Sequence, residues 1–240
     1  MYLKEIILEN TGPISFIKIS MPFDGNNNPK PIVFIGQNGS GKSILVSHIV
    51  NSLLSMKQLV YNDSEVEVGK VFKYRSPAYI KSDSSFSYSK VTFEQDLFQS
   101  EWQLDRDKSE FEEYYQFTPA NNEWNQIDPK TNNYINANFN NQKAQIKNLF
   151  DSSCILYFPP NRFEEPGWLN YDNLVNKADY RFTKQLTDLS NRKIINYCPL
   201  KDNQNYLLDL RWSNKNGHKI LLILCYGNKQ KKNKQAPSAV

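Results

Sequence analysis

The feature that most constrains this 240-residue chain is a glycine-rich octapeptide between an apolar run and an amphipathic segment. Residues 36–43 read G-Q-N-G-S-G-K-S and satisfy the pattern G-x-x-x-x-G-K-[ST]. Glycines let the backbone curl tightly, so that successive N–H groups point at phosphate oxygens. The octapeptide therefore predicts a loop that cradles the phosphates of a nucleotide.

The residues on either side of the octapeptide support this interpretation over a chance match. The run Ile32–Ile35 predicts a short strand that is buried on both faces. After the loop, two rows of apolar residues repeat every four positions and predict a helix with one broad apolar face, starting near Gly41. These rows contain Leu45, Ile49 and Leu53, and Val46, Val50 and Leu54. Strand, loop and helix thus follow in the order that the motif requires.

Each part of the motif has an expected role. Lys42 is expected to reach the β- and γ-phosphates, and the Ser43 hydroxyl is expected to ligate Mg²⁺. The positive N-terminal end of the following helix adds to the cradle. The predicted cofactors are therefore ATP and Mg²⁺, and Ser43 is the predicted metal ligand. The predicted binding residues of the loop are Gly36, Gln37, Asn38, Gly39, Ser40, Gly41, Lys42 and Ser43.

A predicted hairpin precedes this strand–loop–helix unit in the sequence, and a β-rich segment follows it. Tyr2–Leu8 and Ile14–Met21 predict two strands joined by a turn at Asn10–Pro13. Residues from about 60 to 105 are rich in serine, tyrosine and β-branched residues, which predicts an antiparallel β-rich lobe. Its expected short strands are Val66–Val68, Val71–Tyr74, Phe86–Phe93 and Leu97–Leu104.

The second half of the chain alternates predicted helices with polar segments. Ser109–Tyr115 is predicted to be a short helix, with Ser109 as N-cap and Glu112 at the third position. The asparagine-rich stretch 121–141 is predicted to be a loop or partly disordered. Further helices are expected at Gln142–Phe150 and Asp179–Asn191, and strands at Asn205–Trp212 and Lys219–Tyr226.

A second candidate for a central strand is Cys154–Phe158, which two prolines terminate. In open α/β sheets, the loops that leave the C-terminal strand ends line the ligand site. Arg162 is therefore predicted to face the nucleotide or a neighbouring lobe, with Glu164 or Glu165 as its counter-charge. The alternative is a surface turn whose charges are solvated, and the sequence leaves both open.

Charge and cysteine content narrow the classes of partner. The formal net charge of +4 equals the four lysines Lys229, Lys231, Lys232 and Lys234, so the rest of the chain sums to zero. We expect weak DNA binding that depends mostly on the basic, disordered tail 227–240.

No apolar run reaches 18 residues, and the N-terminus is unlike a signal peptide. Three widely spaced cysteines make no metal pattern and fit reduced thiols in the cytoplasm.

The hairpin, the loop Gly36–Ser43, the β-rich segment and the Phe158–Arg162 stretch together resemble ABC-type ATPases of the RecF and SMC kind. More narrowly, they resemble AAA-family ATPases of bacterial anti-phage systems, such as overcoming-lysogenisation-defect nucleases and the ATPase components of Septu and retron defence. The resemblance covers about residues 1–200. It implies an α/β fold with a P-loop, ABC-ATPase-like core in residues 1–226, followed by the tail 227–240.

The resemblance also implies elements that this sequence lacks. Such ATPases carry a Ser-Gly signature, an apolar run that ends in Asp-Glu, and a switch histidine. No Asp-Glu dipeptide occurs here, and Ile220–Leu224 is followed by Cys225-Tyr226-Gly227. Tyr206–Asp209 is only a faint imitation, His218 precedes an apolar run, and His48 is assigned to a polar helix face. We therefore expect nucleotide binding with little or no turnover.

Two hypotheses from different classes follow. The first is an ATP-binding module of an anti-phage defence or DNA-maintenance ATPase, in which nucleotide drives dimerisation or holds a partner nuclease. The second is a non-catalytic P-loop remnant that serves assembly with a partner. A small-molecule kinase is a third and weaker option, since it would lack the hairpin and the β-rich segment.

Overall fold

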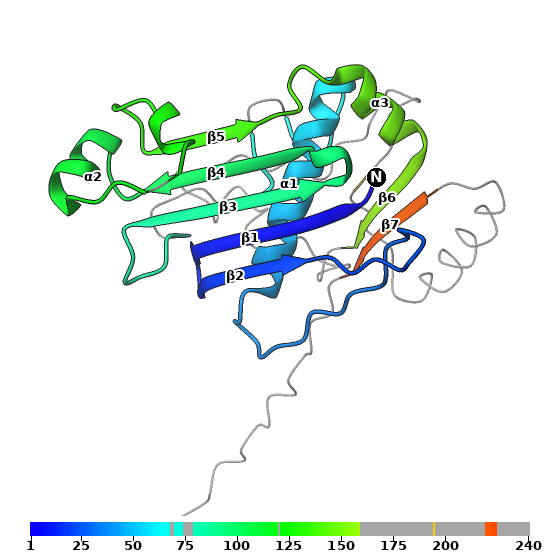
Figure 1. Cartoon of the computed structure of the whole chain (residues 1–240), viewed down its shortest axis with the longest axis horizontal. Coiled ribbons are helices and arrows are strands. Elements are labelled where there is room, and N and C mark those ends of the chain that lie inside the picture. The colour runs from blue at the N-terminus through cyan, green and yellow to red at the C-terminus, as the bar shows by residue number, and fades with distance from the viewer. Residues whose placement is uncertain (68–69, 74–78, 120, 159–193, 195–218, 225–240) are drawn as a thin grey trace, which may run out of the picture.

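The computed structural model describes residues 1–67, 70–73, 79–119, 121–158, 194 and 219–224. Its main layer is a five-stranded antiparallel sheet with the order β2-β1-β3-β4-β5 (Figure 1). The strands of this sheet are β1 (Leu3–Thr11), β2 (Ile14–Ser20), β3 (Phe86–Phe93), β4 (Phe98–Leu104) and β5 (Asn133–Ala137).

The predicted hairpin and the predicted β-rich lobe are joined in this one sheet. β1 pairs with β2 on one side and with β3 on the other, so that Ile6 lies opposite both Ile19 and Val91. The strands predicted at Phe86–Phe93 and Leu97–Leu104 are confirmed as β3 and β4. The hairpin is therefore part of the antiparallel layer rather than a separate feature in front of the loop.

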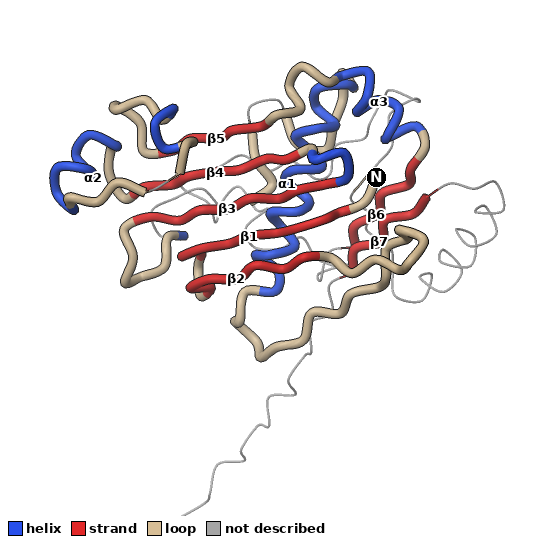
Figure 2. Tube along the Cα trace, viewed as in Figure 1, coloured by secondary structure: helices blue, strands red, loops and turns tan. Residues whose placement is uncertain are grey.

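Helix α1 (Lys42–Val60) packs against one face of the sheet, as the tube drawing of the Cα trace also shows (Figure 2). The helix start at Lys42 confirms the expected start near Gly41. Both predicted apolar rows are buried in the core that α1 shares with Ile6 and Leu8 of β1 and Val91 and Phe93 of β3. Burying these rows is the main force that holds the helix on the sheet, because apolar burial contributes roughly 25 cal/mol per Å².

The opposite face of the sheet has a second, aromatic core. Helix α2 (Lys108–Tyr115) and the short 3₁₀ helix η3 (Trp124–Gln126) cover it. Trp102 contacts Trp124 edge-on with ring centroids 5.3 Å apart, and Tyr88 lies 4.7 Å from Trp102. Two faces of one sheet are thus both buried over β3 and β4.

A second sheet consists of the parallel pair β6 (Ser153–Phe158) and β7 (Lys219–Leu224). Their register runs from Ser153 opposite Lys219 to Phe158 opposite Leu224. Helix α3 (Lys143–Asp151) leads directly into β6. These elements confirm the predicted helix at Gln142–Phe150 and the predicted strand at Cys154–Phe158. The strand predicted at Lys219–Tyr226 is confirmed over Lys219–Leu224. The described chain is therefore a mixed α/β fold with an antiparallel and a parallel sheet.

The strand predicted at Ile32–Ile35 is wrong, since these residues form no strand in the structure. Ile32 and Phe34 are half-buried, whereas Val33 and Ile35 are 78% and 91% exposed. The segment is thus extended with one face toward the core. An all-apolar run indicates which residues favour burial, but it does not supply the neighbouring strand that would bury both faces.

Two other strand predictions are also wrong. Residues 66–67 and 71–73, the described parts of the predicted strands Val66–Val68 and Val71–Tyr74, form bends and irregular structure. Here side chains of α1, rather than a neighbouring strand, form hydrogen bonds with the backbone N–H and C=O groups. Gln58 donates to the carbonyls of Val66 and Glu67, and Asn51 accepts the N–H of Phe72 at 2.9 Å.

The predicted N-cap of the short helix is wrong by two residues. The helix begins at Lys108, with Asp107 before it, and no side chain caps its first turn. Glu112 accepts a hydrogen bond from the Trp124 indole N–H at 2.7 Å instead of closing a capping box. The buried indole needs an acceptor, and Glu112 provides it.

The prediction of a loop or disorder over residues 121–141 is wrong in part. The stretch contains η3 and β5, and Trp124, Ile127 and Phe139 are buried. Asparagine side chains of this stretch form hydrogen bonds with the backbone. Asn138 accepts the N–H of Phe98 at 2.8 Å and donates to the Asp96 carbonyl at 2.8 Å. A few large apolar side chains and local amide bonds fix a segment that is poor in aliphatic residues.

His48 is buried, contrary to its assignment to a polar helix face. It lies on α1 in a layer of buried polar side chains next to the ion pair between Lys73 and Glu101. Burial holds the pKa of His48 down at about 3, nearby Lys73 also lowers it, and Glu101 acts in the opposite direction. The imidazole is therefore neutral at physiological pH.

Several predictions fall outside the described residues. They are the helix at Asp179–Asn191, the strand at Asn205–Trp212, the loop that carries Arg162, and the tail 227–240. Among the described helices, none is long and apolar enough to cross a membrane.

Candidate phosphate-binding loop

The glycine-rich stretch 36–43 is an exposed, tightly turned loop that ends on the first turn of α1. The N–H of Ser40 donates to the Gln37 carbonyl at 3.2 Å, which closes a turn. Gly39 and Gly41 have φ angles of 83° and 94°, a backbone region that glycine enters without steric cost. A Cβ atom at Gly36 would lie 2.7 Å from the Ser40 hydroxyl oxygen. All three glycines of the loop are thus placed where a side chain would be strained, crowded or both.

Helix α1 starts without a side-chain cap. Gly41 is the N-cap, no side chain bonds to the first turn, and the first turn contains no acidic residue. The first N–H groups of a helix have no intrahelical acceptors, and the helix dipole makes this end electropositive. The exposed Ser43 hydroxyl is at the same end. This end of α1 therefore has the donors and the polarity that an anion requires.

The Lys42 ammonium lies across the mouth of the loop. Its Nζ donates to the carbonyl oxygens of Gly36 and Gln37, each at 2.7 Å, and lies 3.4 Å from the Ser40 hydroxyl. The side chain thus turns back over the loop rather than out into solvent. Phosphate oxygens entering the loop would meet a positive charge that is already in position.

The turn of the N-terminal hairpin packs directly against the loop and the start of α1. A Cβ atom at Gly41 would lie 2.6 Å from Cγ1 of Ile14, and one at Gly12 would lie 2.8 Å from Cδ1 of Ile44. Gly12 and Gly41 therefore allow the hairpin and the helix to approach closely. Sequence reasoning did not assign Gly12 or Ile14 to the site. Their only signal was the position of the hairpin immediately before the loop.

The structure brings together the eight predicted residues from Gly36 to Ser43, and the hairpin turn supports them. The other predicted binding residue, Arg162, lies outside the described residues, as do Glu164, Glu165 and Asp209. Within the described chain, the candidate site is thus a backbone cradle with the Lys42 ammonium and the hydroxyl groups of Ser40 and Ser43.

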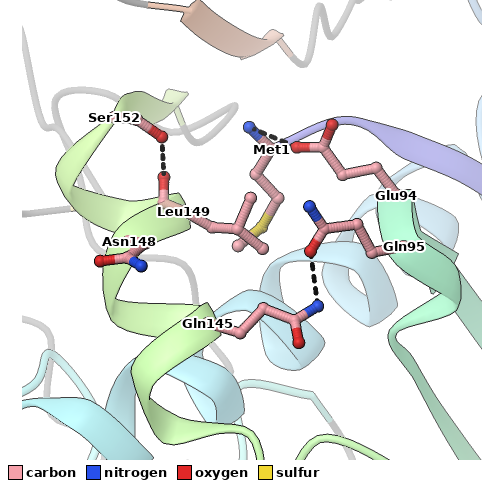
Figure 3. A pocket seen from close by; sticks show the side chains of 7 residues that line it. All are labelled: Met1, Glu94, Gln95, Gln145, Asn148, Leu149 and Ser152. Carbon is pink, nitrogen blue, oxygen red and sulfur yellow. Dashed lines mark hydrogen bonds and ion pairs between the residues drawn. The ribbon is translucent and has the colours of Figure 1, made fainter.

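A pocket of about 540 Å³ lies elsewhere, between the N-terminus, the turn after β3 and helix α3 (Figure 3). Its lining includes Met1, Glu94, Gln95 and Gln145, and the α-amino group of Met1 lies 2.9 Å from Glu94 Oε1. Tyr61, just after α1, packs on α3, so this pocket is near the end of α1 opposite the loop. None of the predicted phosphate-binding residues lines it.

No family model matches the chain, and no curated protein matches it significantly.

Proposed function

We propose that this chain is an ATP-binding P-loop module that holds ATP and Mg²⁺ in the loop Gly36–Ser43. The observation that carries the proposal is the position of the Lys42 ammonium over a glycine loop that opens onto an uncapped helix start. The backbone N–H groups from Asn38 to Ser43 would bind phosphate oxygens, and the Ser43 hydroxyl would ligate the metal. Bound Mg²⁺ would neutralise phosphate charge.

We assign the module to the ABC-ATPase-like branch of P-loop proteins. Helix α1, the antiparallel sheet, and Ile155 and Tyr157 of β6 belong to one hydrophobic core. This arrangement fits a nucleotide core beside an antiparallel lobe, as the sequence resemblance implies. The role in an anti-phage defence or DNA-maintenance system, in the cytoplasm, rests on that resemblance alone. In such a role, nucleotide would drive homodimerisation or hold a partner nuclease, and DNA binding would come from the lysine tail.

Hydrolysis by this chain is proposed to be weak or absent. β7 ends at Leu224 and is followed in the sequence by a cysteine, a tyrosine and a glycine rather than by carboxylates. A thiol and a phenol are largely protonated at neutral pH and cannot replace a carboxylate as metal ligand and base. Steady-state phosphate release that disappears in Lys42→Ala would reveal a carboxylate elsewhere, with Glu164 and Asp209 the first to mutate.

The second candidate function is a non-catalytic remnant that serves assembly, and the missing carboxylates favour it. It differs from the first in its response to nucleotide. The first candidate function predicts that the chain binds ATP in a Mg²⁺-dependent manner. The second predicts that the chain associates with its partner equally well with and without ATP.

Replacing Lys42 by alanine is expected to weaken ATP binding roughly ten- to hundredfold, because hydrogen bonds to charged groups contribute about 1.5–3 kcal/mol. The measurement is equilibrium binding of a fluorescent ATP analogue to the full chain, with Mg²⁺ and with a chelator. Chelation is expected to weaken binding, since Ser43 would hold Mg²⁺ and the metal would neutralise phosphate charge.

Lys30→Ala is the matched control for this experiment. Lys30 is an exposed lysine shortly before the loop, and its replacement removes the same formal charge. It should leave the affinity unchanged. If Lys42→Ala binds ATP as tightly as wild type, or if Lys30→Ala weakens binding as much, the assignment of the site is wrong.

A further inference from the structure

Helix α2 lies at the end of the antiparallel sheet remote from β6 and β7 (Figure 1). At its C-terminal end, Tyr114 and Tyr115 are 68% and 37% exposed. Phe117, just after the helix, is 44% exposed and stacks on Phe86. Phe111 on the inner side of the same helix is fully buried and contacts Trp124. The helix is therefore fixed by its inner side, and its outer aromatic residues are free to contact a partner. Clustered exposed apolar groups of this kind often mark interaction sites.

This face is also acidic. Residues 105–113 contain five acidic side chains and two basic ones. Both cations already have partners: Arg106 is paired with Asp105, and Lys108 lies 3.9 Å from Glu112. Asp107, Glu110 and Glu113 remain as exposed carboxylates around the rings.

The spacing of these residues places acid and ring side by side. Glu110 follows Asp107 by three positions and precedes Tyr114 by four. The three side chains therefore form one stripe along the helix surface. Glu113 flanks this stripe. A cation that lies on the Tyr114 ring would therefore have a carboxylate within reach of its own charge.

Arg106 shows that the rings accept a guanidinium group. Its Cζ lies 4.0 Å from the centroid of Tyr114 and 5.1 Å from that of Tyr115. The Tyr115 hydroxyl donates to Asp105 at 2.7 Å, which fixes that ring. Tyr114 remains 68% exposed even with Arg106 against it. A second guanidinium can thus reach the ring, and cation–π contacts contribute about 0.5–1 kcal/mol at exposed sites.

We propose that the outer face of α2 docks an arginine-containing segment of a partner protein, with one guanidinium stacked on Tyr114 and paired with Glu110 or Glu113. Arginine suits the face better than lysine, because its planar group stacks on aromatic rings and pairs with carboxylates in a bidentate manner. A nucleic acid is disfavoured, since three exposed carboxylates would repel its phosphates. The proposal is independent of nucleotide binding at the loop.

The test is fluorescence anisotropy of a labelled peptide of alternating arginine and glycine, titrated with the full chain. Tyr114→Ala is expected to weaken binding about two- to fivefold, and Tyr114→Phe should retain it because the ring persists. Glu110→Gln together with Glu113→Gln should weaken binding about two- to thirtyfold, from exposed pairs of about 0.2–1 kcal/mol each. A lysine–glycine peptide of equal charge should bind more weakly.

Phe16→Ala is the control, since Phe16 is similarly exposed, at 63%, but lies on β2 away from this face. It should leave the peptide affinity unchanged, and circular dichroism should show that all variants are folded. The proposal is overturned if Tyr114→Ala binds the arginine peptide as tightly as wild type. It is equally overturned if the lysine peptide binds as well, or if labelled oligothymidine binds and loses affinity in Tyr114→Ala.

Discussion

Replacing Glu65 by alanine is expected to lower the free energy of unfolding by about 3–5 kcal/mol, the usual effect of removing one partner of a buried ion pair. Glu65 Oε2 lies 2.7 Å from Nζ of Lys57, and the two side chains are 3% and 0% exposed. The alanine would remove the Glu65 carboxylate from the buried Lys57 ammonium. Taking such a charge out of water costs several kcal/mol when no counter-charge offsets it.

The expected loss also reflects the second role of Glu65. Its other carboxylate oxygen accepts the backbone N–H of Ile194, and the Ile194 carbonyl accepts the N–H of Tyr157 at 2.6 Å. This carboxylate therefore connects the end of α1 to β6. Its removal is expected to loosen the contact between the helix and the parallel sheet as well as the ion pair.

Urea denaturation of a double-mutant cycle measures this effect. Lys57→Met combined with Glu65→Leu should cost far less than the sum of the single changes, because no charge then stays buried. The control is Lys18→Ala, which removes the exposed pair with Glu5 and should cost less than about 1 kcal/mol. Single changes at Glu65 that cost no more than the control, or costs that add up, would contradict the account.

Lowering the pH from 7 to 5 is expected to destabilise the fold by about 2 kcal/mol through His48 alone. Burial, with Lys73 nearby, holds the native pKa of His48 at about 3, whereas an unfolded histidine titrates near 6.5. Below pH 6.5 the unfolded chain therefore binds a proton that the native state excludes. The stability contributed by the neutral imidazole is present above pH 6.5 and falls progressively toward pH 3.

The measurement is the unfolding free energy at several pH values for wild type and His48→Gln. Glutamine is neutral throughout this range, so its stability should depend less on pH by about 2 kcal/mol between pH 7 and 5. The comparison of slopes is informative even if the variant is less stable at every pH. Parallel slopes would show that His48 has the same pKa in the native and unfolded states, which would contradict this prediction.

The sequence predicted the helix after the loop and the N-terminal hairpin because their signals are local, whereas the strand that it predicted at Ile32–Ile35 is not formed. The period-four rows of Leu45 and Val46 specify α1, and the turn at Asn10–Pro13 specifies the hairpin. By contrast, the pairing of β1 with β3 joins residues about eighty positions apart, and no pattern in either strand encodes the partner. The hairpin and the β-rich lobe, which the sequence predicted as separate features, therefore form one sheet in the structure.

Side-chain environments were harder to predict than elements. Val33 and Ile35 are apolar but exposed, while Lys57, Glu65 and His48 are polar but buried. Burial of a charged group depends on a counter-charge, which a distant segment can supply, as β4 supplies Glu101 to the buried Lys73. Residues 36–43, which the motif marks, form a tightly turned loop, but the packing of Ile14 against Gly41 follows only from the tertiary structure.

Hydrogen exchange of the full chain, with and without saturating Mg²⁺ and ATP, tests most directly whether residues 36–43 bind phosphate. The account predicts slower amide exchange confined mainly to peptides that cover Gly36 to Leu45, because the loop and first-turn N–H groups become donors to phosphate. The same protection should be absent in Lys42→Ala at an equal ATP concentration. Unchanged exchange in these peptides, or protection found instead around Gln95 and Gln145, would contradict the account.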